Sequence, residues 1–171
     1  MILLLSGKRG AGKDYVADYL VSNFNFIKLS LAEQVKIDYC KLNGIDYSEM
    51  LDREKKEKHR EKIIELAEGK KKEDLHYWCK ILQSIINQSE QNVVICDVRY
   101  QEELDYFQSI NNINFIRINC SEKERIKRGI IINNIDEDKS ETYFDNYNFE
   151  KVFENDEKLL INISNFININ I

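Results

Sequence analysis

The residues with the clearest chemical potential form one short loop near the N-terminus. The loop runs through Gly7, Lys8, Arg9, Gly10, Ala11, Gly12, Lys13 and Asp14. Glycines at this density let backbone N–H groups converge on phosphate oxygens, and the start of a following helix adds partial positive charge. Lys13 would reach the β- and γ-phosphates of a nucleotide. The pattern predicts a phosphate-binding P-loop; the alternative is a glycine turn whose Lys13 is solvated.

Asp14 departs from the usual P-loop pattern, which has Ser or Thr at this position to ligate Mg²⁺. A carboxylate is a hard oxygen donor that holds magnesium directly or through water. We therefore expect Asp14 to be a magnesium ligand.

Two charged residues follow the apolar run 93–96 in the middle of the chain. Asp97 comes directly after this run, and Arg99 lies two residues later. Ligands of open α/β sheets bind at the carboxyl ends of the strands, so both residues would lie beside the P-loop. Arg99 could then face a phosphate with bidentate geometry. The alternative for Asp97 is a cap at the end of its strand.

A second basic group, Arg125 and Arg128, precedes an Asn- and Asp-rich segment. We expect residues 125–148 to form a lid whose arginines converge with Lys13 and Arg99 on phosphates. Phosphoryl transfer requires this kind of charge around the transferring group, together with exclusion of water. The alternative for Arg125 and Arg128 is an exposed helix with surface ion pairs.

Composition excludes several other function classes. The net charge of −5 provides no general basic field for nucleic acid, and no segment is long and apolar enough for a membrane span or signal peptide. His59 and His76 have no partners that would make a hydrolytic triad. Scattered cysteines without a CxxC pair indicate a reducing cytosol, so we expect a cytoplasmic protein, in the host cytoplasm if it is viral. These cysteines are Cys40, Cys79, Cys96 and Cys120.

Strands alternate with helices along the chain. Strands are predicted at residues 2–5, 26–29, 93–97, 115–118 and 152–153; helices are predicted near 15–24, 31–42, 52–74, 75–86, 104–110, 121–128 and 159–167. The highly charged segment 52–74 fits either a solvated helix with i,i+4 pairs such as Glu54/Lys58 or a mobile substrate-side insertion. The Ile/Asn alternation beyond residue 161 also fits a strand. Together these features predict one α/β domain, residues 1–171, with a P-loop NTPase-like three-layer αβα sandwich, a central parallel sheet and a lid.

With these motifs in place, the chain resembles the small P-loop kinases that phosphorylate a monophosphate. It is similar to phage- and virus-type deoxynucleoside monophosphate kinases and to animal-type phosphomevalonate kinases, and the similarity covers nearly the whole chain. Both groups carry a GKxxxGKD loop, as in residues 7–14. Further matches are the FADPLK-like segment 31–36, the KExxR-like segment 56–60, the DxR element 97–99, the basic lid hinge 125–129, Ser140–Glu141 and the stretch 149–155.

The resemblance implies ATP and Mg²⁺ as cofactors, a small-molecule monophosphate as substrate, and acceptor-side helices in residues 31–90. It implies acceptor-binding roles for Lys36, Lys56, Arg60 and Lys71.

The acceptor is the open choice. Phosphomevalonate kinases tend to have two successive arginines after the DxR aspartate, and Tyr100 occupies the second position here. An aromatic ring can stack on a base, whereas losing a cation disfavours an acceptor with both a carboxylate and a phosphate. We therefore expect a deoxynucleoside monophosphate, with 5-phosphomevalonate as the alternative and a nucleotide-binding switch as a further one.

The expected mechanism assigns a role to each charged residue. Lys13 and Arg9 neutralise the transferring phosphoryl group, and Asp14 coordinates the metal. Arg99, Lys36 and Tyr100 bind the acceptor, Asp97 orients the metal shell or the acceptor, and Arg125 and Arg128 close over the reaction. No general base is needed, because an acceptor phosphate is already anionic.

Overall fold

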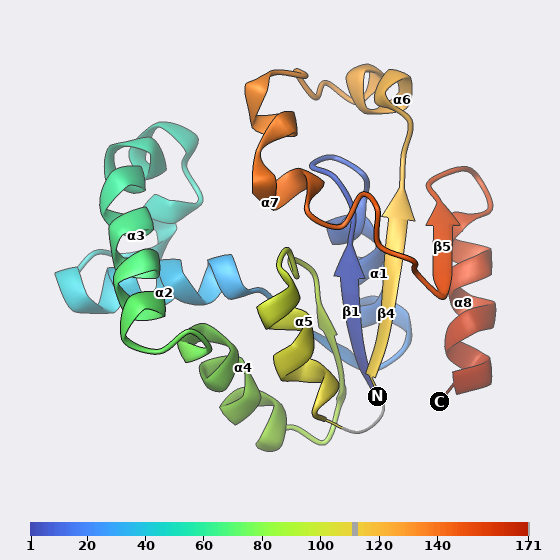
Figure 1. The fold of residues 1–171 in the computed structure, drawn as a ribbon, viewed down its shortest axis with the longest axis horizontal. Coiled ribbons are helices and arrows are strands. Elements are labelled where there is room, and N and C mark those ends of the chain that lie inside the picture. The colour runs from blue at the N-terminus through green and yellow to red at the C-terminus, as the bar shows by residue number, and fades with distance from the viewer. Residues whose placement is uncertain (111–112, 171) are drawn as a thin grey trace. The chain divides into compact units, whose positions relative to one another are not determined.

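The computed structural model describes residues 1–110 and 113–170 (Figure 1). The chain divides into two compact units, which are described separately. The core unit comprises Met1–Leu29 and Ser89–Ile171, and the helical unit comprises Ser30–Gln88.

A five-stranded parallel sheet forms the centre of the core unit. Its strands are β1 (Ile2–Ser6), β2 (Phe26–Leu29), β3 (Asn92–Ile95), β4 (Ile113–Asn119) and β5 (Lys151–Glu154), in the order β2-β3-β1-β4-β5. In the central register, Leu4 pairs with Ile95 on one side and with Phe115 on the other. The predicted parallel sheet is therefore confirmed. β1 is buried along its whole length, as expected for a central parallel strand whose two faces are both covered.

Helices cover both faces of this sheet, as predicted for a three-layer αβα sandwich. The helices and short turns of the core unit are α1 (Lys13–Asn23), α5 (Gln101–Gln108), α6 (Glu122–Lys127), η2 (Asn134–Glu137), α7 (Lys139–Thr142) and α8 (Leu159–Asn170). One apolar cluster joins Leu20 of α1 and Ile163 of α8 to Leu3 and Ile118 of the sheet. On α5, Leu104 and Phe107 are fully buried, and this helix lies on the opposite side of β1 from α1 (Figure 1).

Two details of the core unit differ from the sequence prediction. Ile110 was placed on the buried face of a helix, but α5 ends at Gln108 with Ser109 as its C-cap. The ambiguous C-terminal segment is helical, because Ile163 and Ile167 fall one turn apart and both pack into the apolar cluster.

Helices make up the helical unit, in which α2 (Leu31–Asn43), η1 (Tyr47–Met50), α3 (Arg53–Glu73) and α4 (Tyr77–Asn87) follow one another. The predicted stop of α2 is confirmed, since Gly44 adopts the left-handed conformation (φ 63°) that a helix C-cap requires. Apolar contacts group Tyr39, Cys40 and Met50 with Ile63 and Leu66 of α3.

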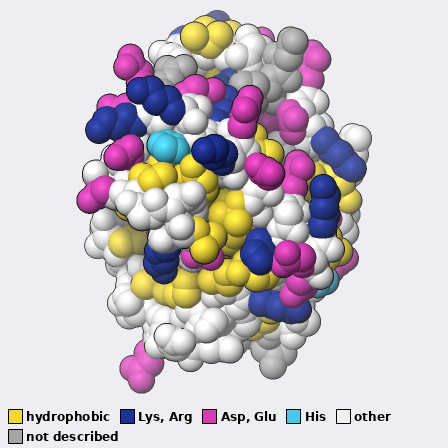
Figure 2. Space-filling model, turned by 90° about the vertical axis from the view of Figure 1, so that its left-hand side faces the viewer, with side chains coloured by type: hydrophobic (Ala, Val, Ile, Leu, Met, Phe, Trp, Pro, Cys, Tyr) yellow, Lys and Arg dark blue, Asp and Glu magenta, His cyan; other side chains and the backbone are white. Residues whose placement is uncertain are grey.

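The charged segment 52–74 is the long helix α3, as one of its two interpretations predicted. Its ion pairs include i,i+3 contacts, Arg60 to Glu57 at 3.2 Å and Lys70 to Glu73 at 2.9 Å, in place of the expected Glu54/Lys58 type. Basic and acidic side chains are interspersed on the face of the protein that carries α2 and α3 (Figure 2). His59, expected to lack a partner, contacts the Tyr39 hydroxyl through Nδ1 at 3.0 Å.

No helix in the described parts of the chain is long and apolar enough to cross a membrane.

Candidate active site

The P-loop is built as the sequence predicts, between β1 and α1. Gly7, Gly10 and Gly12 have φ angles of 144°, 74° and 105°, a region that residues with a Cβ rarely adopt. A Cβ on Gly7 would overlap the carbonyl oxygen of Ile118, and one on Gly12 would overlap the amide of Asn155. The close approach of these neighbours explains why the glycines are needed.

Lys13, the first residue of α1, folds back over this loop. Its ammonium group donates to the carbonyl oxygens of Gly7 (2.6 Å) and Lys8 (3.1 Å). Burial, and next the positive charge of Arg99, lower the pKa of Lys13, while the carboxylates of Glu141, Asp14 and Asp97 act to raise it. A desolvated cation at the start of a helix attracts a phosphate strongly.

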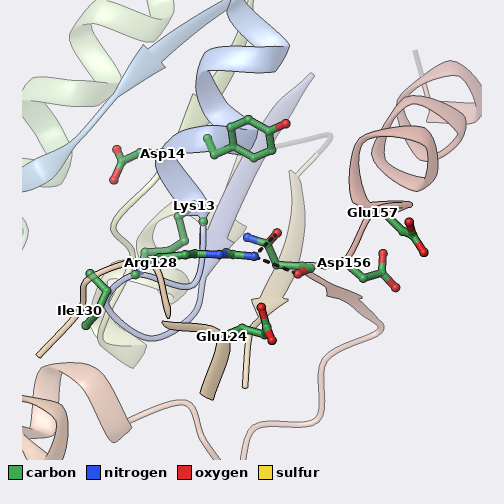
Figure 3. A pocket seen from close by; sticks show the side chains of 11 residues that line it. Lys13, Asp14, Glu124, Arg128, Ile130, Asp156 and Glu157 are labelled. Carbon is green, nitrogen blue, oxygen red and sulfur yellow. Dashed lines mark hydrogen bonds between the residues drawn. The ribbon is translucent and has the colours of Figure 1, made fainter. Parts of the chain in front are cut away.

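A cavity of about 900 Å³ opens beside Lys13 (Figure 3). It is lined by Gly10, Gly12, Lys13, Asp14, Tyr15, Glu124, Arg128, Ile130, Asn155, Asp156 and Glu157. The Arg128 guanidinium donates to the backbone and side-chain oxygens of Asn155, both at 3.2 Å, and the Asn155 amide donates to the Ala11 carbonyl at 2.7 Å. The structure thus brings Arg128 to the P-loop, and Asn155 is the connection.

Asp14 points into solvent at the edge of this cavity, with its side chain 77 % exposed. Lys28, which the sequence interpretation did not select, contacts it at 2.8 Å and also contacts Asp18 at 3.0 Å. Burial acts to lower the pKa of Lys28, but these two carboxylates outweigh it and raise the pKa.

The carboxylates near the P-loop fit magnesium only when it is bound together with a nucleotide. Among residues 1–110 and 113–170, no three His, Cys, Asp or Glu side chains gather into a set that could hold a metal ion. Magnesium commonly keeps several waters and binds through one or two carboxylates plus substrate phosphates, and the exposed Asp14 can supply one of these carboxylates.

Arg9 and Arg125 meet at a buried carboxylate in residues 125–148, the predicted lid, called the lid segment below. Asp136 is 7 % exposed, and it accepts hydrogen bonds from Arg125 Nη1 at 2.7 Å, Arg9 Nη2 at 3.0 Å and the backbone N–H of Asn133 at 3.1 Å. Arg125 Nη1 also donates to the Arg9 carbonyl at 3.1 Å. Burial opposes ionisation of Asp136, but these hydrogen bonds and charges outweigh it and lower the pKa of its carboxyl group to about 2.

This arrangement differs from the expected roles of both arginines. Arg125 is 4 % exposed and is turned toward Asp136, so it is neither a lining residue of the cavity nor the exposed surface residue of the alternative interpretation. Arg9 Nη2 is held by Asp136 and by the Ile131 carbonyl (2.6 Å), which ties the P-loop to the lid segment. Their predicted contact with the transferring phosphate stays a prediction.

Arg99 lies after β3, and its guanidinium contacts α7 in the lid segment. Its Nη1 donates to a carboxylate oxygen of Glu141 and to the Ser140 hydroxyl at 3.2 Å. Burial acts to lower the pKa of Arg99, but Glu141, Asp97 and Glu103 raise it above its ordinary value. Asp97 and Arg99 were predicted to lie beside the P-loop. The charges of Lys13, Asp97 and Arg99 do act on one another in the structure.

Lys8 and Tyr100 also contact neighbouring side chains. Lys8 pairs with Asp145 at 3.0 Å, and the other oxygen of Asp145 accepts from Arg117 at 2.6 Å. The Tyr100 ring packs edge-on against Tyr143 at 5.5 Å between centroids. This contact weakens the argument that Tyr100 stacks on a base.

The four basic residues assigned to the acceptor all lie in the helical unit. Lys36 on α2 pairs with Glu33 at 2.6 Å, and Arg60 on α3 pairs with Glu57 at 3.2 Å. Lys56 is exposed and Lys71 is half-buried, both on α3. Their role in binding an acceptor stays a prediction.

Sequence reasoning missed Lys28, Asp136 and Asn155. Asn155 directly follows β5, so the rule that ligands gather at the carboxyl ends of parallel strands could have found it. Lys28 lies within β2, and Asp136 lies in a segment without periodicity, so neither carried a comparable signal.

Comparisons with known proteins agree with this geometry. The family model "Phosphomevalonate kinase" matches residues 5–114. A phosphomevalonate kinase of Drosophila melanogaster is 26 % identical over 169 residues, covering 92 % of this chain and 89 % of its own. Among solved structures, shikimate kinase from Aquifex aeolicus has a TM-score of 0.54 at 14 % identity and covers 99 % of this chain and 98 % of its own. A gluconokinase from Sinorhizobium meliloti has a TM-score of 0.55 at 12 % identity, with coverages of 98 % and 92 %. These distant structures establish the fold as that of P-loop kinases.

Proposed function

The chain belongs to the phosphomevalonate kinase family, and we propose that it transfers the γ-phosphoryl group of ATP to 5-phosphomevalonate, producing 5-diphosphomevalonate and ADP. The protein is a kinase, and its family implies ATP as the phosphoryl donor. The observation that supports this acceptor is the family match over residues 5–114, which includes the P-loop, the helical unit and the DxR element.

This acceptor replaces the deoxynucleoside monophosphate that the sequence interpretation preferred. That preference rested on the loss of the second arginine and on a Tyr100 ring stacked on a base, and the second point is weakened because the ring has Tyr143 as an edge-on neighbour. Neither the family match nor the Drosophila relative supports the nucleotide acceptor. The phosphomevalonate alternative therefore becomes the main proposal.

In the proposed reaction, an oxygen of the acceptor phosphate attacks the γ-phosphorus of ATP, and the bond from that phosphorus to the β,γ-bridging oxygen breaks. The acceptor phosphate is anionic near neutral pH, so no side chain has to remove a proton. Lys13 and the P-loop N–H groups stabilise charge on the transferring group and on the departing ADP. Magnesium, when bound with ATP, would neutralise phosphate oxygens, with Asp14 as its carboxylate ligand.

Arg99 is the proposed ligand of the acceptor phosphate. The guanidinium contacts Ser140 and Glu141 through Nη1, and its Nε and Nη2 groups can donate to a phosphate. The acceptor carboxylate needs a further cation, because Tyr100 stands where the family tends to have a second arginine. We assign this role to the basic residues of the helical unit, Lys36, Lys56, Arg60 and Lys71.

The free state of all four cysteines, three of them buried, supports the proposal that the protein works in a reducing cytoplasm.

A coupled assay of ADP release tests the proposal directly. The purified chain is incubated with ATP and Mg²⁺, and 5-phosphomevalonate or each deoxynucleoside monophosphate is added in parallel. We expect saturable stimulation by 5-phosphomevalonate and none by the nucleotides. Stimulation by a nucleotide alone would identify a deoxynucleoside monophosphate as the acceptor, and slow hydrolysis independent of any acceptor would indicate a nucleotide-binding switch.

A further inference from the structure

Glu141 connects two parts of the proposed site without having a role of its own in the proposed reaction. It lies in α7, and its side chain is 4 % exposed. Its Oε1 accepts from Arg99 Nη1, and its Oε2 accepts from the backbone N–H of Arg9 at 2.6 Å. One buried carboxylate therefore joins the P-loop backbone to the guanidinium of Arg99.

We propose that Glu141 is a positioning residue for phosphoryl transfer, which holds the Arg99 guanidinium at a fixed orientation relative to the P-loop. The inference rests on the proposed function, because it takes Arg99 to be the ligand of the acceptor phosphate. It extends that function by assigning to the lid segment a carboxylate that links the donor side of the reaction to the acceptor side.

The shape of the guanidinium makes this link effective. The group is planar and presents its donors in a rigid fork, so a carboxylate on Nη1 also sets the direction of Nη2. Ser140, the neighbour of Glu141, adds its hydroxyl to the same nitrogen at 3.2 Å. In-line transfer depends on such alignment, since small displacements of a reacting group reduce the rate strongly.

The same contacts could instead let Glu141 compete with an anionic ligand for Arg99. Burial argues for the positioning role. If an anionic ligand took Arg99, Glu141 Oε1 would lose its guanidinium partner at 4 % side-chain exposure, and leaving a buried carboxylate oxygen without a donor costs free energy. The carboxylate is also divided between two elements, so displacing it from Arg99 would leave it bonded to the Arg9 N–H.

The decisive experiment is the kinetics of Glu141→Gln with 5-phosphomevalonate as the variable substrate. The amide keeps the size of the side chain but turns an NH₂ group toward one of its two donors, Arg99 Nη1 or the backbone N–H of Arg9. We expect kcat to fall about 10- to 100-fold and KM for ATP to change less than about threefold. Glu137→Gln is the matched control, because Glu137 is an exposed carboxylate of the same segment, and it should keep the wild-type kcat.

A double-mutant cycle with Arg99→Lys separates positioning from a merely structural role. Lysine lacks the planar fork, so in the Arg99→Lys background the Glu141→Gln change should lower kcat by less than about threefold. An equal loss in both backgrounds would overturn the proposal, and so would an increase in kcat/KM for the acceptor, which indicates competition. If Glu141→Gln does not fold, Glu141→Asp is measured in the same cycle. The wild-type protein tests the proposed function separately, and if it prefers another monophosphate, that acceptor is used in the cycle.

Discussion

Replacing Asp136 by Asn should destabilise the core unit by about 2–3 kcal/mol at neutral pH. The carboxylate is 7 % exposed and accepts hydrogen bonds from Arg125, Arg9 and the backbone of Asn133. An asparagine has one acceptor oxygen, and its amide NH₂ would face a guanidinium donor. The change therefore removes a charge and a hydrogen-bond acceptor at once.

Two considerations set this magnitude. The pKa of Asp136 falls from 3.8 in the unfolded chain to about 2 in the folded protein, which corresponds to about 2 kcal/mol of stability. Arg125, at 4 % exposure, would also lose its anion, and breaking a buried pair in this way costs about 3–5 kcal/mol. The remaining amide oxygen and the solvent beside the partly exposed Arg9 reduce this loss, which leads to the intermediate value.

The effect has a defined dependence on pH. Because folding depresses the pKa of Asp136, its contribution is present above the unfolded value of 3.8 and is lost as the pH falls toward about 2. The difference in unfolding free energy between wild type and Asp136→Asn should thus be constant near neutral pH and shrink below about pH 4.

Urea unfolding followed by circular dichroism, near pH 7 and near pH 3, measures this difference. Glu137→Gln serves as the charge-matched control and should stay within about 0.5 kcal/mol of wild type. The double change Arg125→Met with Asp136→Leu removes both members of the Arg125–Asp136 ion pair. It should recover part of the unfolding free energy that Asp136→Asn loses. The reasoning is refuted if Asp136→Asn unfolds within about 0.5 kcal/mol of wild type, or if its deficit persists unchanged at low pH.

Three further predictions concern Lys13, Asn155 and a pair of helix glycines. Lys13→Ala should reduce kcat by about 100-fold or more in the ADP-release assay, and near-normal turnover would contradict the mechanism. Asn155→Ala should raise KM for ATP by about 5- to 20-fold, because the Ala11 carbonyl loses its amide donor and Arg128 keeps only the backbone oxygen of residue 155; an unchanged KM would exclude the Asn155 side chain from the nucleotide site. Gly69→Ala, inside α3 with open space around it, should raise the unfolding free energy by up to about 1 kcal/mol. Gly44→Ala should lower it by about 1 kcal/mol, because φ is +63° there; equal effects of these two substitutions would contradict the backbone argument.

Local patterns predicted most of the fold. β1 and β3 contain continuous apolar runs. Such runs are typical of strands that are buried on both faces, so the sequence alone predicts this burial. The end of α5 was misplaced because Ile110 continues the apolar spacing of Leu104 and Phe107, although the helix ends before it. Periodicity identifies a buried face but does not determine where the helical hydrogen bonds stop.

The site was predictable where its residues adjoin a strand end or a glycine loop. Lys13, Asp97 and Arg99 have such positions, and the structure brings their charges together. Arg125 was assigned to the phosphates because its helix precedes the lid, yet its partner is Asp136, eleven residues farther along the chain. This contact depends on how a segment without hydrophobic periodicity folds back. The spacing of residues in the sequence does not predict that.

The measurement that tests the central claim most directly is the fate of the γ-phosphate of ATP. Radiolabelled γ-phosphate is supplied with 5-phosphomevalonate and Mg²⁺, and the products are separated and counted. The proposal predicts that the label appears in a diphosphate ester of mevalonate in an amount equal to the ADP formed. Label recovered as inorganic phosphate alone, or only in a nucleoside diphosphate when a deoxynucleoside monophosphate is also present, would contradict it.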